Sequence, residues 1–324
     1  MILFILKRIL LLIPVIIAVS FIVFALLEAA PGDLVDVIIA RAGELTPEEI
    51  EQLRIDHHLD RSMFFRYGIY MRNLLQGDLG VSDLTGLSVW NSFMQRLPNT
   101  LILSFTALIF GLAVAVPMGI IAARNAGKLV DNAASVMTLI GMSMPVFWIG
   151  LLMVVLFSGR LGLLPPAGNQ HGIRSLIMPA ICSGLSLTAS TARQTRSSML
   201  DLLKADFLRT AAAKGVPRET VVRKHALGNA WIPIVTAAGA SLSAQLAGSV
   251  VVESVFAWPG IGQFAADAVF NRDINAIMGT IILTTVLYVL VQLVVDVLYA
   301  FIDPRIKSQY VGARRKRKKK EVMA

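Results

Sequence analysis

Long runs of apolar residues, separated by charged segments, dominate the chain. The hydrocarbon core of a bilayer is ~30 Å thick and a helix rises ~1.5 Å per residue, so about 20 uncharged residues can cross it. Six uncharged runs have roughly this length. We therefore predict six membrane-spanning helices, at Ile9–Leu27, Thr100–Ala123, Ala133–Gly159, Ser175–Ala192, Trp231–Val252 and Ile274–Val295.

The composition also indicates a membrane protein. Hydrophobic residues make up 56% and charged residues 16% of the 324 positions, whereas about a quarter of the residues of a soluble domain are charged. Lys7 and Arg8 precede the first run, as in a secretory signal, but that run is longer than the ~7–15 residues of a signal's apolar region. We expect an uncleaved first span and an all-α integral membrane protein.

Lysine and arginine are distributed unevenly between alternate connections. Cytoplasmic loops of membrane proteins carry the excess of these residues. With the N-terminus in the cytoplasm, most of the 30 Lys and Arg residues fall on the cytoplasmic side, including the run RRKRKKK at 314–320. We expect both termini in the cytoplasm, and a tail that meets anionic membrane lipid and not nucleic acid.

This topology divides the chain into a first span at 1–29, an extracytoplasmic helical subdomain at 30–98, a five-helix core at 99–303 and a basic tail at 304–324. Within the subdomain, the capping-box sequence Thr46-Pro47-Glu48-Glu49 predicts a helix that runs towards His57. A second helix is expected at Ser62–Leu75 and a turn at Gly77–Gly80. The subdomain either contacts an extracytoplasmic partner or caps the spans.

The connection at 193–229 is unusually long and basic for a loop between two spans. Gly215 suits the left-handed position after a helix, and Pro217 suits the first position of the next helix. We predict a helix, a tight turn and a second helix that ends near Leu227. The alanines from Ala211 to Ala213 would let a partner's backbone approach closely. The alternative is an ordinary hairpin at the membrane surface.

This segment resembles the cytoplasmic coupling segment of the permease subunits of ATP-binding-cassette (ABC) importers. Their loose signature is E-A-A, three residues, G, nine residues, I-x-L-P, of which Ala211, Gly215 and Leu227 match here. The departures resemble the variant of the dipeptide, oligopeptide and nickel importers, with RTAAAKG at 209–215 followed by His225, Asn229 and Pro233.

The resemblance extends over nearly the whole chain, and is closest to the first of the two permease subunits of such importers, which has a large outer loop. The similar segments are KRILLLIPVIIAVSFIVFALLEAAPGD, QGDLGVS, LPNTLILS, GMSMPVFWIG, LGLLPPAG, VVVESVFAWPGIGQFAADAVFNRD and VDVLYAFIDPRIK. It implies the type I ABC importer permease fold. It also implies a second homologous permease, one or two ABC ATPase subunits and an extracytoplasmic substrate-binding protein as partners.

The resemblance assigns ATPase coupling to one group of residues: Arg209, Thr210, Ala211, Ala212, Ala213, Lys214 and Gly215. The sequence lacks a G-x-x-x-x-G-K-[ST] phosphate loop, so we expect no catalytic residue and no cofactor in this chain, with ATP and Mg²⁺ bound by the ATPase partners. The implied function is import of di- or oligopeptides across the bacterial cytoplasmic membrane. Nickel, a metallophore or glutathione are alternative cargoes, and a secondary transporter is the alternative class.

The end of the fifth predicted span contains a Trp-Pro-Gly break, which predicts a turn at the outer interface. The resemblance places Glu253, Trp258, Pro259 and Gly260 near the outer gate. The alternative is a simple turn with an interfacial tryptophan.

Asp296, which directly follows the run Ile274–Val295, is the only acidic residue that we place inside a spanning helix. An unpaired carboxylate would be costly there, so we expect a buried ion pair or a helix cap near the cytoplasmic face, with Arg193 or Arg196 as candidate partners, and not a proton relay. Cys182 is the only cysteine, which excludes a disulfide within the chain, and no residue spacing suits a metal site.

Overall fold

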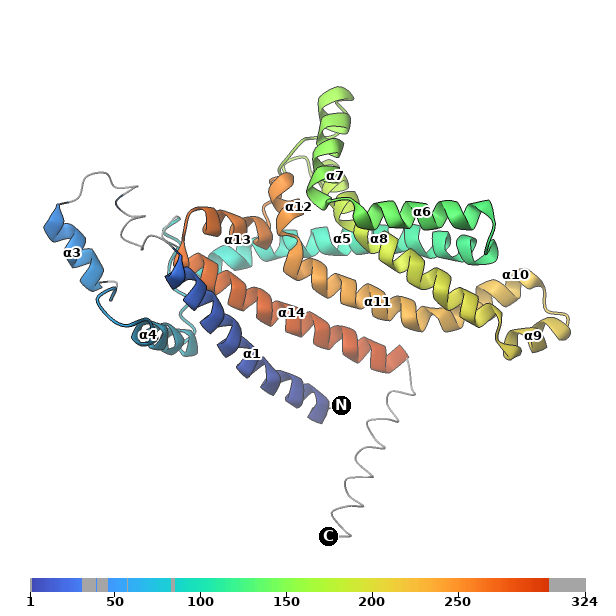
Figure 1. Ribbon diagram of the computed structural model, residues 1–324, viewed down its shortest axis with the longest axis horizontal. Helices are drawn as coiled ribbons and strands as arrows, with labels where there is room; N and C mark the ends of the chain where they lie inside the picture. Colours follow the sequence, from blue (N-terminus) through green and yellow to red (C-terminus); the bar gives the residue numbers. More distant parts are fainter. Residues whose placement is uncertain (1, 31–38, 40–45, 57, 83–84, 303–324) are drawn as a thin grey trace, which may run out of the picture. The chain divides into compact units, whose positions relative to one another are not determined.

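The computed structural model describes residues 2–30, 39, 46–56, 58–82 and 85–302, most of which lie in helices (Figure 1). The elements are α1 (Ile2–Ala29), α3 (Pro47–Asp56), α4 (Met63–Leu75), α5 (Val89–Arg124), α6 (Leu129–Ser143), α7 (Val146–Met153), η1 (Val154–Arg160), α8 (Ile173–Leu203), α9 (Asp206–Ala213), α10 (Arg218–Thr220), η2 (Val221–Ala226), α11 (Leu227–Gly248), α12 (Val250–Val255), α13 (Ile261–Phe270) and α14 (Ile274–Ile302). The basic tail expected at 304–324 lies outside the described residues.

The predicted class, an all-α membrane protein, is confirmed. Within the described ranges, α1, α5, α8 and α14 are long and apolar enough to cross a bilayer. The pair formed by α6 and α7–η1 would make a fifth span, but it bends by 98°. Pro145 follows α6 directly and holds Met144 in an extended conformation, which ends the helix.

Several predicted boundaries are wrong. The run Ala133–Gly159 is the bent pair and not one continuous helix. The run Trp231–Val252 is divided between α11 and α12 at Ser249. In the basic segment, α8 continues to Leu203, and the second helix of the hairpin passes through η2 into α11 and does not end near Leu227.

Contacts divide the chain into two compact units. Unit 1 comprises Met1–Leu101 and Ala247–Val289, and unit 2 comprises Ile102–Leu246 and Leu290–Ala324. The division into four parts expected from the topology stays a prediction.

The two outer helices of unit 1 begin as their sequences predict. The backbone N–H of Thr46 donates to Glu49 Oε2 (2.8 Å), and the Glu49 N–H donates to Thr46 Oγ1 (3.3 Å), which completes the capping box of α3. The bond from the Thr46 N–H and a second one from Thr46 Oγ1 (2.9 Å) to the same carboxylate oxygen hold the pKa of Glu49 below its ordinary value. At α4, Ser62 Oγ accepts from the Phe65 N–H (3.4 Å). Both predicted helix starts are confirmed.

The predicted turn Gly77–Gly80 is also confirmed, with φ of +81° at its first and +78° at its last residue. Directly after it, Ser82 Oγ donates to Asp273 Oδ2 (2.6 Å). The other oxygen of Asp273 accepts from the Ala276 N–H (2.9 Å) and so caps α14. The turn and the start of α14 share a buried cluster of Leu79, Val89, Phe264, Ala268, Ala276 and Ile277.

In unit 2, glycines let α5 and α8 pack closely. A Cβ added to Gly119 would lie 2.7 Å from the carbonyl oxygen of Ala192 and 2.6 Å from Thr195 Cβ. At Gly184, an added Cβ would lie 2.9 Å from the carbonyl oxygen of Ala107. Backbone atoms cannot move aside as a flexible side chain can, so these positions need glycine.

We predict that Gly119→Ala lowers the stability of the purified protein. One extra methyl group against a rigid backbone costs about 1–3 kcal/mol by overpacking. The control is Gly228→Ala in α11, where the added Cβ meets no atom within 4 Å. It should be neutral or stabilising, because alanine favours a helix over glycine by up to ~1 kcal/mol. Thermal unfolding in detergent measures both; equal melting temperatures would contradict the proposed packing.

Candidate functional site

The predicted hairpin begins with the short helix α9. The Lys214 N–H donates to the Thr210 carbonyl (3.1 Å) in an ordinary i→i−4 helix bond. The Val216 N–H donates to the Ala211 carbonyl (3.3 Å), which is the six-to-one bond of a Schellman helix end. Gly215 lies in that turn with φ +80°. A Cβ added there would meet no atom within 4 Å, so the backbone conformation alone requires glycine. The prediction that Gly215 ends this helix is confirmed.

The inner face of the hairpin belongs to a buried apolar cluster. Leu208 is 3% exposed, and Ala211 and Val216 pack beside it. The other buried members come from α5, α8, η2 and α11, and are Val116, Ala123, Met199, Val221, Val222, Ala226, Ala230 and Ile234. Because α5 and α8 are candidate spans, close packing fixes the hairpin to membrane helices.

The outer face of α9 is exposed. Of the residues predicted for coupling, Arg209, Thr210, Ala213, Lys214 and Gly215 are exposed, whereas Ala211 packs inwards. Ala212 lies on α9, and its side chain is outside the described part of the structure. The sequence reasoning missed Phe207, which is 46% exposed on this short helix. Its only sequence signal was a large aromatic residue between Asp206 and Leu208.

An acidic residue links the hairpin to the end of α5. Glu219 follows Pro217 in α10, and its carboxylate lies 2.9 Å from Arg124 Nη2 and 2.7 Å from Arg223 Nε. These side chains are largely exposed, so the ion pairs contribute little free energy compared with the apolar cluster.

The second predicted site, at Glu253–Gly260, is built around a buried carboxylate. Glu253 is 0% exposed. Its Oε1 accepts from Thr100 Oγ1 (2.8 Å) and Ser249 Oγ (2.7 Å), and its Oε2 accepts from the Gln263 N–H (3.0 Å). Three neutral donors therefore surround this carboxylate. We call these four residues, with Asn99 and Trp258, the Glu253 network.

Thr100 and Asn99 attach the Trp-Pro-Gly segment to α5. Thr100 Oγ1, besides donating to the carboxylate, accepts from the Ile261 N–H (2.8 Å). Asn99 accepts from Trp258 Nε1 (3.0 Å) at its carbonyl and donates from Nδ2 to the Pro259 carbonyl (2.9 Å). The sequence reasoning missed both residues, because they are more than 150 positions away from their partners.

The fit around the carboxylate is tight. A Cβ added to Gly260 would lie 2.3 Å from Glu253 Oε2, so any larger residue would push the carboxylate away from its donors. Trp258 is 4% exposed, which excludes the alternative of a tryptophan facing the membrane interface. The structure therefore brings together all four residues predicted for the outer gate in one buried contact region.

Two family models together match most of the chain. The N-terminal model of binding-protein-dependent transport system membrane components matches residues 1–106, and the model of binding-protein-dependent transport system inner membrane components matches residues 115–308. The chain belongs to this family.

Three relatives of this permease are similar over nearly their full lengths. The dipeptide transport system permease protein DppB of Escherichia coli K12 is 35% identical, with 94% of this chain and 99% of the relative covered. The di/tripeptide permease protein DppB of Pseudomonas aeruginosa UCBPP-PA14 is 38% identical, and the oligopeptide permease protein AppB of Bacillus subtilis 168 is 34% identical, with the same coverage. The predicted family is confirmed.

A solved structure supports the fold. The MetNI methionine ABC transporter in inward-facing conformations matches with a TM-score of 0.55 at 20% identity, over 65% of this permease and 96% of that chain.

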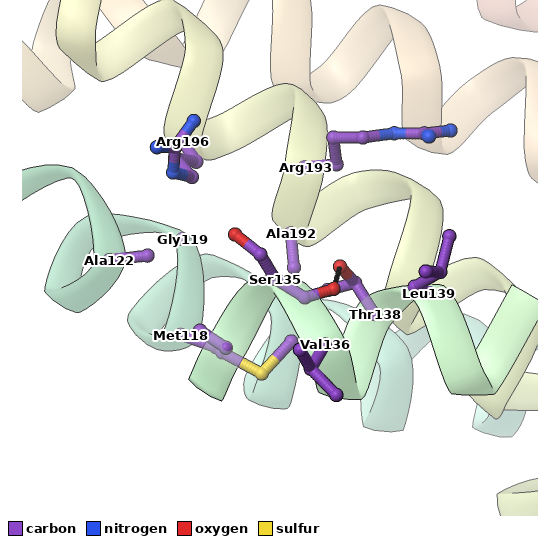
Figure 2. A pocket seen from close by; sticks show the side chains of 11 residues that line it. Met118, Gly119, Ala122, Ser135, Val136, Thr138, Leu139, Ala192, Arg193 and Arg196 are labelled. Carbon is purple, nitrogen blue, oxygen red and sulfur yellow. Dashed lines mark hydrogen bonds between the residues drawn. The ribbon is translucent and has the colours of Figure 1, made fainter. Parts of the chain in front are cut away.

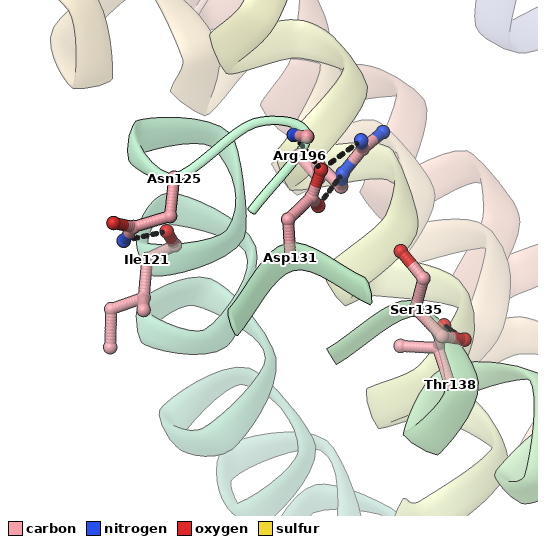
Figure 3. Close-up of polar contacts among 7 residues, drawn as sticks. Ile121, Asn125, Asp131, Ser135, Thr138 and Arg196 are labelled. Atoms are coloured by element: carbon pink, nitrogen blue, oxygen red, sulfur yellow. Dashed lines mark hydrogen bonds and ion pairs between the residues drawn. The ribbon is translucent and has the colours of Figure 1, made fainter. Parts of the chain in front are cut away.

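The permease also contains an ion pair that the sequence analysis did not anticipate (Figure 3). Asp131, at the start of α6, is 2% exposed. It accepts from Arg196 Nε (2.5 Å) and Nη2 (2.7 Å), and from the Gly127 N–H (2.9 Å). The pair joins α6 to α8 across 65 residues of sequence, and its only local signal was an acidic residue in the first turn of a helix.

Of the two candidate partners of Asp296, Arg196 binds Asp131, so that pairing is wrong, and the pairing with Arg193 stays a prediction. Asp296 Oδ1 instead accepts from Gln292 Nε2 (3.2 Å), and Gln292 Oε1 is 3.0 Å from Ser243 Oγ. Asp296 is also not the only acidic residue within the apolar helices, since Asp131 and Glu253 are both buried.

A cavity of about 320 Å³ lies between α5, α6 and α8 (Figure 2). Small residues such as Gly119, Ala134 and Ala192 line it, and Arg193 and Arg196 lie at its border. The hydroxyl of Thr138 bonds to the Ser135 carbonyl on its own helix. No cluster of potential metal ligands occurs among the residues that the structure describes.

We predict that Thr100→Val destabilises the permease. Valine has the shape of threonine but leaves the Glu253 carboxylate and the Ile261 N–H each without one partner, at a cost of about 1–3 kcal/mol per buried group. Thr106→Val on the same helix is the control, because Thr106 bonds only to the Ile102 carbonyl one turn earlier. The melting temperature should fall for Thr100→Val alone; an equal fall in both variants would contradict the role of the Glu253 network.

Asp131→Asn should also destabilise the permease, by about 1.5–3 kcal/mol, because it removes a charge-assisted pair. Arg196 is 33% exposed, so the loss stays below that of a fully buried pair. The matched control is Asp206→Asn, whose pair with Arg209 is long (3.9 Å) and exposed. Denaturation in detergent should show no change for Asp206→Asn; an unchanged stability of Asp131→Asn would argue against the ion pair.

Proposed function

We propose that this chain is the permease subunit of an ATP-driven importer of di- and oligopeptides. In this proposal both termini lie in the cytoplasm, and the chain assembles with a second homologous permease, ABC ATPase subunits and an extracytoplasmic substrate-binding protein. The observation that carries the proposal is the hairpin at α9. Its inner face is packed among membrane helices and its outer face is free to bind a partner.

The proposed ATPase contact is the exposed face of α9 with Phe207, Arg209, Ala213 and Lys214. An aromatic and a basic residue beside small ones are typical of a protein-binding surface. Since Leu208 is packed in the apolar cluster, displacement of α9 by a partner would move α5, α8 and α11 as a rigid body. The sequence has no phosphate loop, so ATP and Mg²⁺ belong to the partner.

On the other side of the membrane, the Glu253 network is the proposed base of the outer gate. Its hydrogen bonds make the Trp-Pro-Gly segment move with the Asn99–Thr100 turn of α5. A gate attached in this way opens or closes only when that part of α5 moves.

The proposed cargo follows the relatives, which are permeases for dipeptides, di- and tripeptides, and oligopeptides. Nickel, a metallophore and glutathione remain the alternatives. The described residues offer no cluster of metal ligands that would favour nickel.

We predict that Ala213→Trp abolishes uptake while the protein still inserts and folds. Ala213 is exposed at the end of α9, so a large side chain there blocks a partner without disturbing the inner cluster. The amount of ATPase that copurifies should fall by about tenfold or more, the effect of losing ~1.4 kcal/mol of binding free energy.

The control for this variant is Ala126→Trp, an identical change at an exposed position in the turn between α5 and α6. It should retain the ATPase and uptake. Resistance of the α9 hairpin to proteolysis distinguishes a blocked surface from an unfolded one. Normal uptake by a well-inserted Ala213→Trp variant would overturn the assignment of the ATPase contact.

For the complete importer in proteoliposomes with its binding protein, uptake of a labelled dipeptide should require ATP on the cytoplasmic side and should persist with a protonophore. This result separates an ABC importer from a secondary transporter, whose uptake would stop with the protonophore. Saturating nickel should not compete with the dipeptide; competition would favour the alternative cargo.

A further inference from the structure

The contacts of α4 show how deep this helix lies, although the sequence predicts it as part of an extracytoplasmic subdomain. The ring of Tyr67 lies 5.3 Å from that of Phe21 and 5.6 Å from that of Phe24, and both phenylalanines belong to the first span. The Tyr67 hydroxyl reaches further, donating to the Ile17 carbonyl (3.2 Å). The ring of Phe64 also stacks on Phe21, at 6.2 Å. Thus α4 crosses α1 at the level of Phe21 and Phe24.

This level lies inside the hydrocarbon. The candidate span of α1, Arg8–Ala29, matches the ~30 Å of a bilayer core, and its uncharged part ends at Leu27. Counting back from Leu27, Phe24 lies about 4.5 Å and Phe21 about 9 Å below the end of the span. A tilt of ~20° changes these depths by less than about 1 Å. We infer that α4 is embedded in the non-cytoplasmic leaflet and that lipid covers its free face.

Two of the hydroxyl groups between the two helices fit this depth, whereas Tyr70 Oη and Arg66 Nε are buried at the same contact without a hydrogen-bond partner. Tyr67 Oη and Ser20 Oγ lie 3.0 Å apart, and Ser20, which is 1% exposed, also donates to the Ile17 carbonyl (3.1 Å). In hydrocarbon, such groups must be satisfied within the protein. The charged pair of the contact, Arg66 with Glu28, lies at the end of α1, where the headgroups begin. Aromatic contacts are deep and the charges are at the boundary, as expected for an interfacial helix.

The free face of α4 carries large apolar side chains. Phe64 is 71%, Phe65 52% and Leu75 84% exposed. On α1 at the same level, Ile22 is 56% and Leu26 66% exposed, so the apolar surface of the span continues onto α4. The other side of the helix contacts protein, since Leu74 packs against the buried apolar cluster at the start of α14.

Lipid is the occupant that this arrangement supports. A free face at hydrocarbon depth, continuous with the surface of a span, is in contact with acyl chains unless another protein displaces them. Arg61 lies over the Phe65 ring at 5.8 Å, and Arg72 is exposed on the same helix. Long basic side chains at this position can reach phosphate groups while the aromatic rings stay in the acyl region.

The test measures the surroundings of spin labels on the complete importer in nanodiscs of phosphatidylethanolamine and phosphatidylglycerol. Phe64→Cys and Leu75→Cys are labelled in a Cys182→Ala background, because Cys182 is the only native cysteine. Ile22→Cys on α1 is the lipid-exposed control. Ile55→Cys on α3 is the water-exposed control, because Ile55 is 47% exposed on a helix with no buried residue.

We expect both α4 labels to resemble Ile22→Cys, with several-fold greater relaxation by oxygen than by a water-soluble nickel chelate. Labels that respond to the chelate as Ile55→Cys does would place α4 in water and overturn the inference. Labels that respond to neither reagent would mean that a second permease or the binding protein covers the helix, and would overturn it as well. The readout does not depend on transport activity.

Discussion

Hydrocarbon offers no water to a polar group, so the protein itself must satisfy each break in a membrane helix. The structure meets this constraint with a few polar side chains. Glu253, Thr100 and Ser249 satisfy one another and the backbone where α11 gives way to α12 and α13. Asp273 caps α14 and accepts a hydrogen bond from Ser82 Oγ. At each of these breaks, hydrogen bonds therefore hold together segments that are far apart in the sequence.

The two candidate sites use different physical means. The Glu253 network is directional, since each hydrogen bond fixes the position of one backbone segment against another. The α9 hairpin is held by non-directional packing of Leu208, Ala211 and Val216 and leaves its polar atoms to the surface. One continuous helix, α5, carries Thr100 in its first half and Ala123 at its other end. Directional hydrogen bonds suit the proposed gate, because they fix the positions of its segments. Apolar packing suits the proposed coupling hairpin, because packed side chains can shift without breaking specific bonds.

Features that depend on neighbours in sequence were predictable. The capping box at Thr46, the helix start at Ser62 and the left-handed Gly215 all follow from local chemistry, and all are confirmed. Long-range partners were not predictable, because nothing near Asp131 points to Arg196, and nothing near Glu253 points to Thr100. The continuation of α8 to Leu203 was hidden for a related reason: charged residues mark the end of hydrocarbon but not the end of a helix. The coupling and gating roles themselves stay predictions.

Gly215 is required for its left-handed backbone conformation and not for its small size. Its φ of +80° is unfavourable for any L-residue with a Cβ, yet the space around it is empty. Asparagine is the natural residue with a Cβ that tolerates this conformation best. The turn therefore presents bare backbone on its open side, and a partner can come within contact distance of the peptide groups themselves.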